Sequence, residues 1–207
     1  MEVNRSMLEL LDNLGHKVLA VFRCGSSIYD MKTSDSDEDY IVIVDDYDDC
    51  QILKDHVSDL FVIGISALPR VFNLEKNILE YFLMWVDNVD LLKENIVQID
   101  EDRKEEILSL LKVDWDKCFY RWLNINLDYF RLNLIYGPEE KVLYNLYKLN
   151  SITKHYLETK EFKSFYSIED RKLALDFKSH KEKRLAHNPK LHEIFNYLEM
   201  VVKEGEQ

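Results

Sequence analysis

Residues 25–44 read GSSIYDMKTSDSDEDYIVIV, and this stretch decides the fold. Residues 18–24 (VLAVFRC), just before it, are rich in β-branched and aromatic side chains, which is typical of a strand. Residues 25–34 are polar and turn-like, whereas residues 40–44 are apolar at every position, as in a strand buried on both faces. The stretch therefore predicts two strands joined by a polar turn and an acidic segment.

The turn and the acidic segment carry the residues that suggest chemistry. Gly25 has no Cβ, so the backbone can approach a ligand closely. The N–H groups of the turn and the Ser26 hydroxyl can hold phosphate oxygens. In extended chain, residues two apart share a face, so Asp37 and Asp39 are expected to point the same way. Two such carboxylates repel unless a cation offsets their charge, and Mg²⁺ favours carboxylate and phosphate oxygens. We therefore expect a site for Mg²⁺ and phosphate groups here.

A third carboxylate is expected beside these two. Residues 60–65 are predicted to form a strand, which could lie beside the 40–44 strand, and Asp59 opens it. Asp59 is therefore the natural third metal ligand, although an ordinary turn residue before a strand would give the same pattern. Asp35 is interpreted as a turn residue near the site rather than a ligand, and the acidic run 45–49 as a solvated loop.

An EF-hand calcium loop is the rival interpretation of the acidic triplet. Asp35, Asp37 and Asp39 match the first, third and fifth positions of that loop. The sixth position is Tyr40, where glycine is needed, and the twelfth is Asp46 rather than glutamate. A β-branched run also replaces the helix that should follow. The calcium interpretation is therefore rejected.

Helical periodicity dominates the rest of the chain, so the sequence predicts an α+β fold. Apolar residues at helical spacing predict helices within 6–14, 68–85 (two short helices), 103–111, 118–135, 139–157, 168–180 and 191–202. The Gly137-Pro138 break predicts antiparallel neighbouring helices, and the aromatic side chains of 119–136 are expected to be buried. The expected architecture is a small mixed β-sheet domain over residues 1–95, packed with a C-terminal helical bundle over residues 96–207.

Composition and charge limit the class of protein. The chain has 207 residues, of which 46% are hydrophobic, and a formal net charge of −12. A core can form, but an extended DNA-binding surface is not expected. The three cysteines form no CxxC pair, which favours reduced thiols. The first residues do not resemble a signal peptide, and no apolar stretch is long enough to cross a membrane. We expect a cytoplasmic protein with no membrane partner.

The spacing of the turn and acidic residues resembles that of a known family. Residues 25–39 follow the pattern Gly-Ser-x-x-Tyr, then Asp-Ser-Asp-x-Asp. This pattern is similar to the signature of the predicted nucleotidyltransferases of the DNA polymerase β superfamily. The similarity continues through residues 59–63 and 74–80 and covers about half of the chain. Farther on, a basic helix motif of the family is echoed only by Lys141, Asn145 and Lys148.

The resemblance implies a role for each matching residue. Asp37, Asp39 and Asp59 would be the catalytic carboxylates and would hold Mg²⁺ or Mn²⁺. The triphosphate of the nucleotide would be held by Gly25, Ser26, Ser27, Lys141 and Lys148. Lys141 and Lys148 are seven residues apart and so share one helix face.

Three positions depart from the family pattern. Ser27 stands where arginine is common, Asp30 where glycine usually follows the tyrosine, and Asn145 where histidine is common. These departures bear on the substrate class more than on the fold. The basic segment 178–184 is interpreted as a solvated face that could guide a phosphate-bearing substrate.

The resemblance implies a metal-dependent enzyme that moves a nucleotidyl group from a nucleoside triphosphate to a hydroxyl acceptor and releases pyrophosphate. The acceptor stays open among an RNA end, a protein side chain and a small molecule, and so does the base of the nucleotide. The alternative is a non-catalytic nucleotide-binding or regulatory module, antitoxin-like, that keeps the fold. The retained Asp37 and Asp39 favour the enzyme, whereas the lost basic residues favour the alternative.

Overall fold

The structure is a computed structural model that describes the chain in several stretches. The described residues are 13, 15–25, 28, 38–54, 58–72, 89–136, 140–162, 168–169, 172 and 189–205. The chain forms two compact units, Met1–Asp114 and Trp115–Gln207, and each is described by itself.

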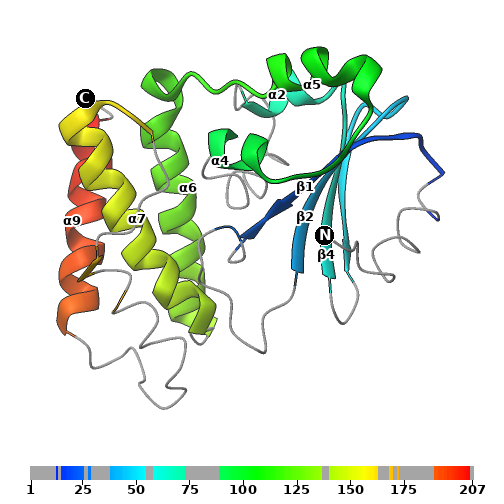
Figure 1. Cartoon of the computed structure of the whole chain (residues 1–207). Helices are drawn as coiled ribbons and strands as arrows, with labels where there is room; N and C mark the ends of the chain where they lie inside the picture. Colours follow the sequence, from blue (N-terminus) through cyan, green and yellow to red (C-terminus); the bar gives the residue numbers. More distant parts are fainter. Residues whose placement is uncertain are drawn as a thin grey trace. The chain divides into compact units, whose positions relative to one another are not determined.

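The first unit is built on a five-stranded mixed sheet (Figure 1). The strands are β1 (Val18–Cys24), β2 (Glu38–Val44), β3 (Cys50–Lys54), β4 (Ser58–Gly64) and β5 (Ile96–Ile99). Their order across the sheet is β3-β4-β2-β1-β5. The β2–β4 pair is parallel and the other pairs are antiparallel. The mixed sheet and the α+β class expected from the sequence are confirmed.

The three central strands follow the apolar runs of the sequence. The strands expected at 18–24, 40–44 and 60–65 correspond to β1, β2 and β4, but β2 and β4 each begin two residues earlier than expected. The edge strands β3 and β5 were not predicted, because they are short and only partly buried. An edge strand has one neighbour, so its sequence carries a weaker apolar signal than a central strand.

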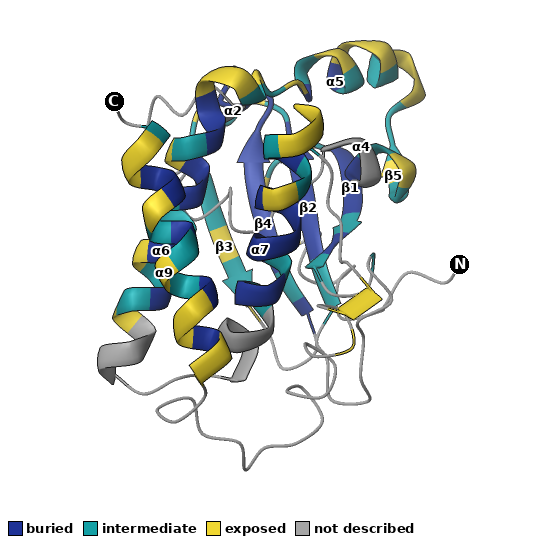
Figure 2. Cartoon of the chain, turned by 90° about the vertical axis from the view of Figure 1, so that its left-hand side faces the viewer, coloured by how far each residue is buried: buried dark blue, intermediate teal, exposed yellow. Residues whose placement is uncertain are grey.

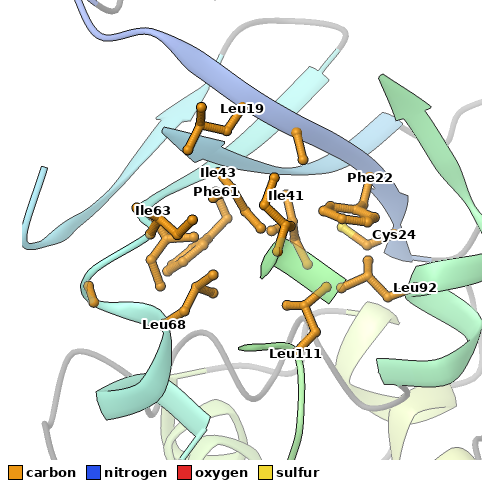
Figure 3. Close-up of a cluster of buried hydrophobic side chains, with 14 residues drawn as sticks. Leu19, Phe22, Cys24, Ile41, Ile43, Phe61, Ile63, Leu68, Leu92 and Leu111 are labelled. Carbon is orange, nitrogen blue, oxygen red and sulfur yellow. The ribbon is translucent and has the colours of Figure 1, made fainter. Parts of the chain in front are cut away.

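One face of the sheet carries the main core of the first unit (Figure 3). Phe22, Ile41 and Phe61 from the three central strands are buried there, and Leu92 and Leu111 pack with them. The covering helices are α2 (Leu68–Phe72), α4 (Val89–Glu94) and α5 (Lys104–Leu110), the last preceded by the 3₁₀ turn η2 (Glu101–Arg103). Alternate residues of the same strands form a second buried cluster on the other face: Val21, Tyr40, Val42, Val44, Leu60 and Val62.

The second unit is helical. Its long helices, α6 (Trp115–Tyr136), α7 (Glu140–Thr159) and α9 (Pro189–Gly205), lie side by side and bury one stripe each (Figure 2). Phe119 and Trp122 are fully buried, and the Phe119 ring stacks on Tyr156 of α7 with ring centroids 3.9 Å apart. The Arg131 guanidinium of α6 donates to the Glu199 carboxylate of α9, with a nitrogen–oxygen distance of 2.8 Å. The expected burial of the aromatic side chains of 119–136 is confirmed for Phe119, Trp122 and Phe130, whereas Tyr120 and Tyr129 are half-buried.

The observed division of the chain differs from the expected division at residue 95. Strand β5 pairs with β1, and Ile107 of α5 belongs to the main core on one face of the sheet. Residues 96–114 therefore belong to the first unit. Most of the helix expected at 6–14, and parts of the helices expected at 68–85 and 168–180, lie outside the described residues. Within the described part of the chain, no helix is both long and apolar enough to cross a membrane.

The central position of β2 gives a stability prediction. Ile41 is 0% exposed, so Ile41→Ala should lower the free energy of unfolding by about 2–5 kcal/mol through lost burial and a cavity. Ile52 on the edge strand β3 is 39% exposed, and Ile52→Ala should cost less than about 1 kcal/mol. Urea denaturation followed by far-ultraviolet circular dichroism measures both. Equal losses would contradict the placement of β2 inside the sheet.

Candidate functional site

Two carboxylates lie next to each other at one end of the central strands. Asp39 of β2 is directly opposite Asp59 in the parallel register of β2 and β4. Neighbouring strands are about 4.8 Å apart, and residues in register project from the same face of a sheet. The Asp59 side chain is only 13% exposed, and Asp39 is half-buried. We call Asp39 and Asp59 the carboxylate pair.

The Gly25 backbone lies directly against the carboxylate pair. Cys24 ends β1 opposite Asp39, and Gly25 follows with a φ of +67°. A Cβ at Gly25 would lie 1.9 Å from Asp39 Oδ2, which no side chain can tolerate. Two properties of this position require glycine: the left-handed backbone and the close approach to the Asp39 carboxylate. Gly25, the residue that follows β1, therefore contacts Asp39.

A lysine completes the row of groups at this end of the sheet. Lys54, the last residue of β3, is opposite Asp59 in the antiparallel register of β3 and β4. Its ammonium donates to Asp59 Oδ2 over 2.6 Å. Sequence analysis did not select Lys54, because β3 was not recognised. The available signal was a lysine five residues before the third carboxylate.

The other face at the same strand ends carries a different polar cluster. Tyr40 is buried, and its hydroxyl donates to the Glu38 carboxylate. The Arg23 guanidinium lies 6.0 Å from the centre of the Tyr40 ring. Burial, and then the hydrogen bond to Glu38, raise the pKa of Tyr40 to about 12, so the phenol stays neutral at physiological pH. Because side chains alternate along a strand, Glu38 belongs to this cluster and not to the carboxylate pair.

The remaining residues expected at the site divide into two groups. Several lie outside the described residues: Ser26, Ser27, Asp30, Asp35 and Asp37. Lys141 and Lys148 lie on α7 in the second unit, with Lys148 half-buried, and their role in holding the triphosphate stays a prediction. In the described stretches, no group of three or more histidine, cysteine or acidic side chains lies close enough together to hold a metal.

The carboxylate pair itself fits a divalent cation. Adjacent carboxylate oxygens are the ligands that Mg²⁺ and Mn²⁺ prefer. The space beside the bare Gly25 backbone is filled by the Asp39 carboxylate, so this contact positions Asp39. The ammonium of Lys54 already occupies one oxygen of Asp59 as a cation would. The donor set of this strand end therefore fits a divalent cation.

A separate hollow lies in the helical unit, between α7 and α9. Its volume is about 570 Å³. Its lining mixes two lysines with three glutamates, and Lys190 of α9 is paired with Glu169 over 2.8 Å. Opposite charges within the lining thus offset one another. None of the residues selected from the sequence lines this hollow.

Comparisons with known proteins find no match in sequence and only distant similarity in structure. No family model matches the chain, and no curated protein sequence matches it. Among solved structures, it is similar to a nucleotidyltransferase-like protein from Exiguobacterium sibiricum 255-15, with 13% sequence identity and a TM-score of 0.32. That alignment covers 97% of this chain and 73% of the other. A likeness of this size adds nothing to the reasoning from the carboxylate pair.

The contact between Gly25 and Asp39 predicts that alanine is tolerated less well at Gly25 than at Gly15. Gly15 and Gly25 have nearly the same left-handed backbone, with φ of +70° and +67°, but a Cβ at Gly15 would meet nothing within 4 Å. Gly15→Ala should therefore cost only the backbone strain, about 1–2 kcal/mol. Gly25→Ala should cost at least about 1 kcal/mol more, because its Cβ must displace Asp39. Thermal and urea unfolding measure the difference, and equal costs would show that Gly25 does not touch Asp39.

Proposed function

We propose that this chain is a metal-dependent nucleotidyltransferase of the DNA polymerase β type. It would transfer a nucleotidyl group from a nucleoside triphosphate to a hydroxyl acceptor and release pyrophosphate. The observation that carries the proposal is the register of β2 and β4, which sets Asp39 beside Asp59 with the glycine turn against Asp39. The acidic pattern of residues 35–39 supports the same site.

Each element of the site has a proposed task. Asp37, Asp39 and Asp59 would bind Mg²⁺ or Mn²⁺, and the turn of Gly25, Ser26 and Ser27 would hold the triphosphate. A bound divalent cation would supply neutralising charge for the phosphate oxygens and for the leaving pyrophosphate. The β-sheet supplies rigidity, because the core residues that follow Asp39 and Asp59 are fully buried. Positioning and charge are the main requirements of phosphoryl chemistry.

The proposed reaction is a displacement at the α-phosphorus of the nucleotide. The acceptor hydroxyl oxygen forms a bond to this phosphorus, and the bond from the phosphorus to the bridging β-phosphate oxygen breaks. One carboxylate of the site accepts the hydroxyl proton. The acceptor would be an RNA end, a protein side chain or a small molecule. The net charge of −12 disfavours a long polyanion, except where local positive charge offsets it.

One observation favours a second candidate function. Lys54 places an ammonium group at the site, which a nucleotide-binding module without a metal would use to contact a phosphate. Thermal melting with a nucleoside triphosphate, with and without Mg²⁺, separates the two functions, because a ligand that binds only the native state raises the melting temperature. An increase that requires Mg²⁺ supports the transferase. An increase that is the same without Mg²⁺ supports the regulatory module.

The transferase proposal predicts that Asp39→Asn separates activity from stability. The amide keeps the shape of the side chain but loses the charge that binds a cation, so nucleotide transfer should fall at least about 100-fold. The metal-free protein should be as stable as before or more stable, because repulsion between Asp39 and Asp59 is relieved. Radiolabelled nucleotide transfer and metal-free melting measure the two effects.

A matched control is Asp100→Asn in the same unit. Asp100 pairs with Lys17 over 2.7 Å and accepts a hydrogen bond from the backbone N–H of Asp102, so it caps η2. Asparagine keeps the cap but loses the Lys17 ion pair, so the stability of this variant should fall slightly or stay unchanged and should not rise, and its Mg²⁺-dependent triphosphate binding should be kept. If Asp39→Asn behaves like Asp100→Asn, Asp39 is a structural residue and the proposed site is wrong.

A further inference from the structure

The two side chains of the Lys54–Asp59 ion pair differ in their exposure to solvent. The Asp59 side chain is 13% exposed, whereas the Lys54 side chain that reaches it is 61% exposed. Lys54 ends an edge strand, and its flexible four-carbon stem carries the ammonium onto Asp59 Oδ2. A carboxylate fixed by the sheet is thus held by a cation that can move away into solvent.

The ammonium occupies an oxygen that a metal would use. Asp39 and Asp59 repel each other when both are ionised, and the Lys54 ammonium offsets part of this repulsion. Metal–oxygen bonds in such sites are about 2.0–2.6 Å long. The ammonium lies 2.6 Å from Asp59 Oδ2, so a divalent cation bound to the same carboxylate would lie close to a like charge and be repelled by it. Metal binding at Asp59 is therefore favoured when the ammonium moves away.

We propose that Lys54 is an exchangeable counter-ion that holds Asp59 in the metal-free protein and makes divalent cations compete for the site. The inference rests on the proposed function, since it assumes that Asp59 binds the metal. A free cation at Asp59 meets the repulsion of the Lys54 ammonium. A cation that arrives with a triphosphate brings phosphate oxygens that can accept the released ammonium. Lys54 thereby favours the joint binding of metal and nucleotide over binding of metal alone.

The chain contains a closely matched control for Lys54. Lys17 pairs with Asp100 over 2.7 Å, and the two side chains are 65% and 19% exposed. This second pair lies in the same unit and has nearly the same length and exposure as Lys54–Asp59. Asp100 has no proposed role at the carboxylate pair. Loss of either lysine should therefore have a similar structural effect, and only loss of Lys54 should change metal binding.

The test is titration of the metal-free protein with Mn²⁺, followed by electron paramagnetic resonance, in the wild type and in Lys54→Met, Lys54→Arg and Lys17→Met. Lys54→Met should bind Mn²⁺ at least about threefold more tightly, the factor expected when an ion pair of this exposure no longer competes. Lys17→Met should bind as the wild type does. Lys54→Arg, which keeps the charge, should bind no more tightly than the wild type.

A second titration adds a non-hydrolysable nucleoside triphosphate. In Lys54→Met, the nucleotide should increase Mn²⁺ affinity by a smaller factor than in the wild type, because the released ammonium no longer meets the phosphates. If Lys54→Met and Lys17→Met bind Mn²⁺ equally, with and without nucleotide, Lys54 only closes the β3–β4 hairpin and the inference is overturned. If the wild type binds Mn²⁺ no better than Asp39→Asn does, the proposed function fails together with the inference.

Discussion

The parallel pairing of β2 with β4 is the constraint on which the rest of the structure depends. Its register runs without interruption from Glu38 opposite Ser58 to Val44 opposite Gly64. A shift of one residue would turn every side chain of a strand to the other face of the sheet. The core fixes the register, because the following residues of both strands are fully buried. The same core therefore holds Asp39 against Asp59, although their charges repel.

The polar residues and the core residues occupy different parts of β2 and β4. The polar residues are confined to the first positions of β2 and β4, and the apolar residues that follow supply the core (Figure 3). The two faces of the sheet also differ at these first positions. One face holds the carboxylate pair, and the other holds the Tyr40–Glu38 hydrogen bond. Alternation along a strand thus keeps Glu38 away from Asp39 and Asp59 and limits the negative charge in the site.

Positive charge at this end of the sheet comes from an edge strand. An edge strand tolerates a lysine, because the ammonium can stay in water while the stem lies on the sheet. Lys54 uses this position to reach a carboxylate of the neighbouring strand. On a chain with a net charge of −12, this ammonium is a local source of positive charge beside two carboxylates.

The sequence by itself determined the apolar strands, the helical second half and the residue types of the site, because periodicity and local spacing are properties of the chain alone. It did not determine β3 or β5, which depend on a neighbour for their hydrogen bonds and bury few residues. Only the tertiary structure decided that β4 lies beside β2 and that Lys54 faces Asp59. It also decided that Gly25 touches Asp39. These are contacts between segments distant in sequence, and strand order and register set them, which no local pattern encodes.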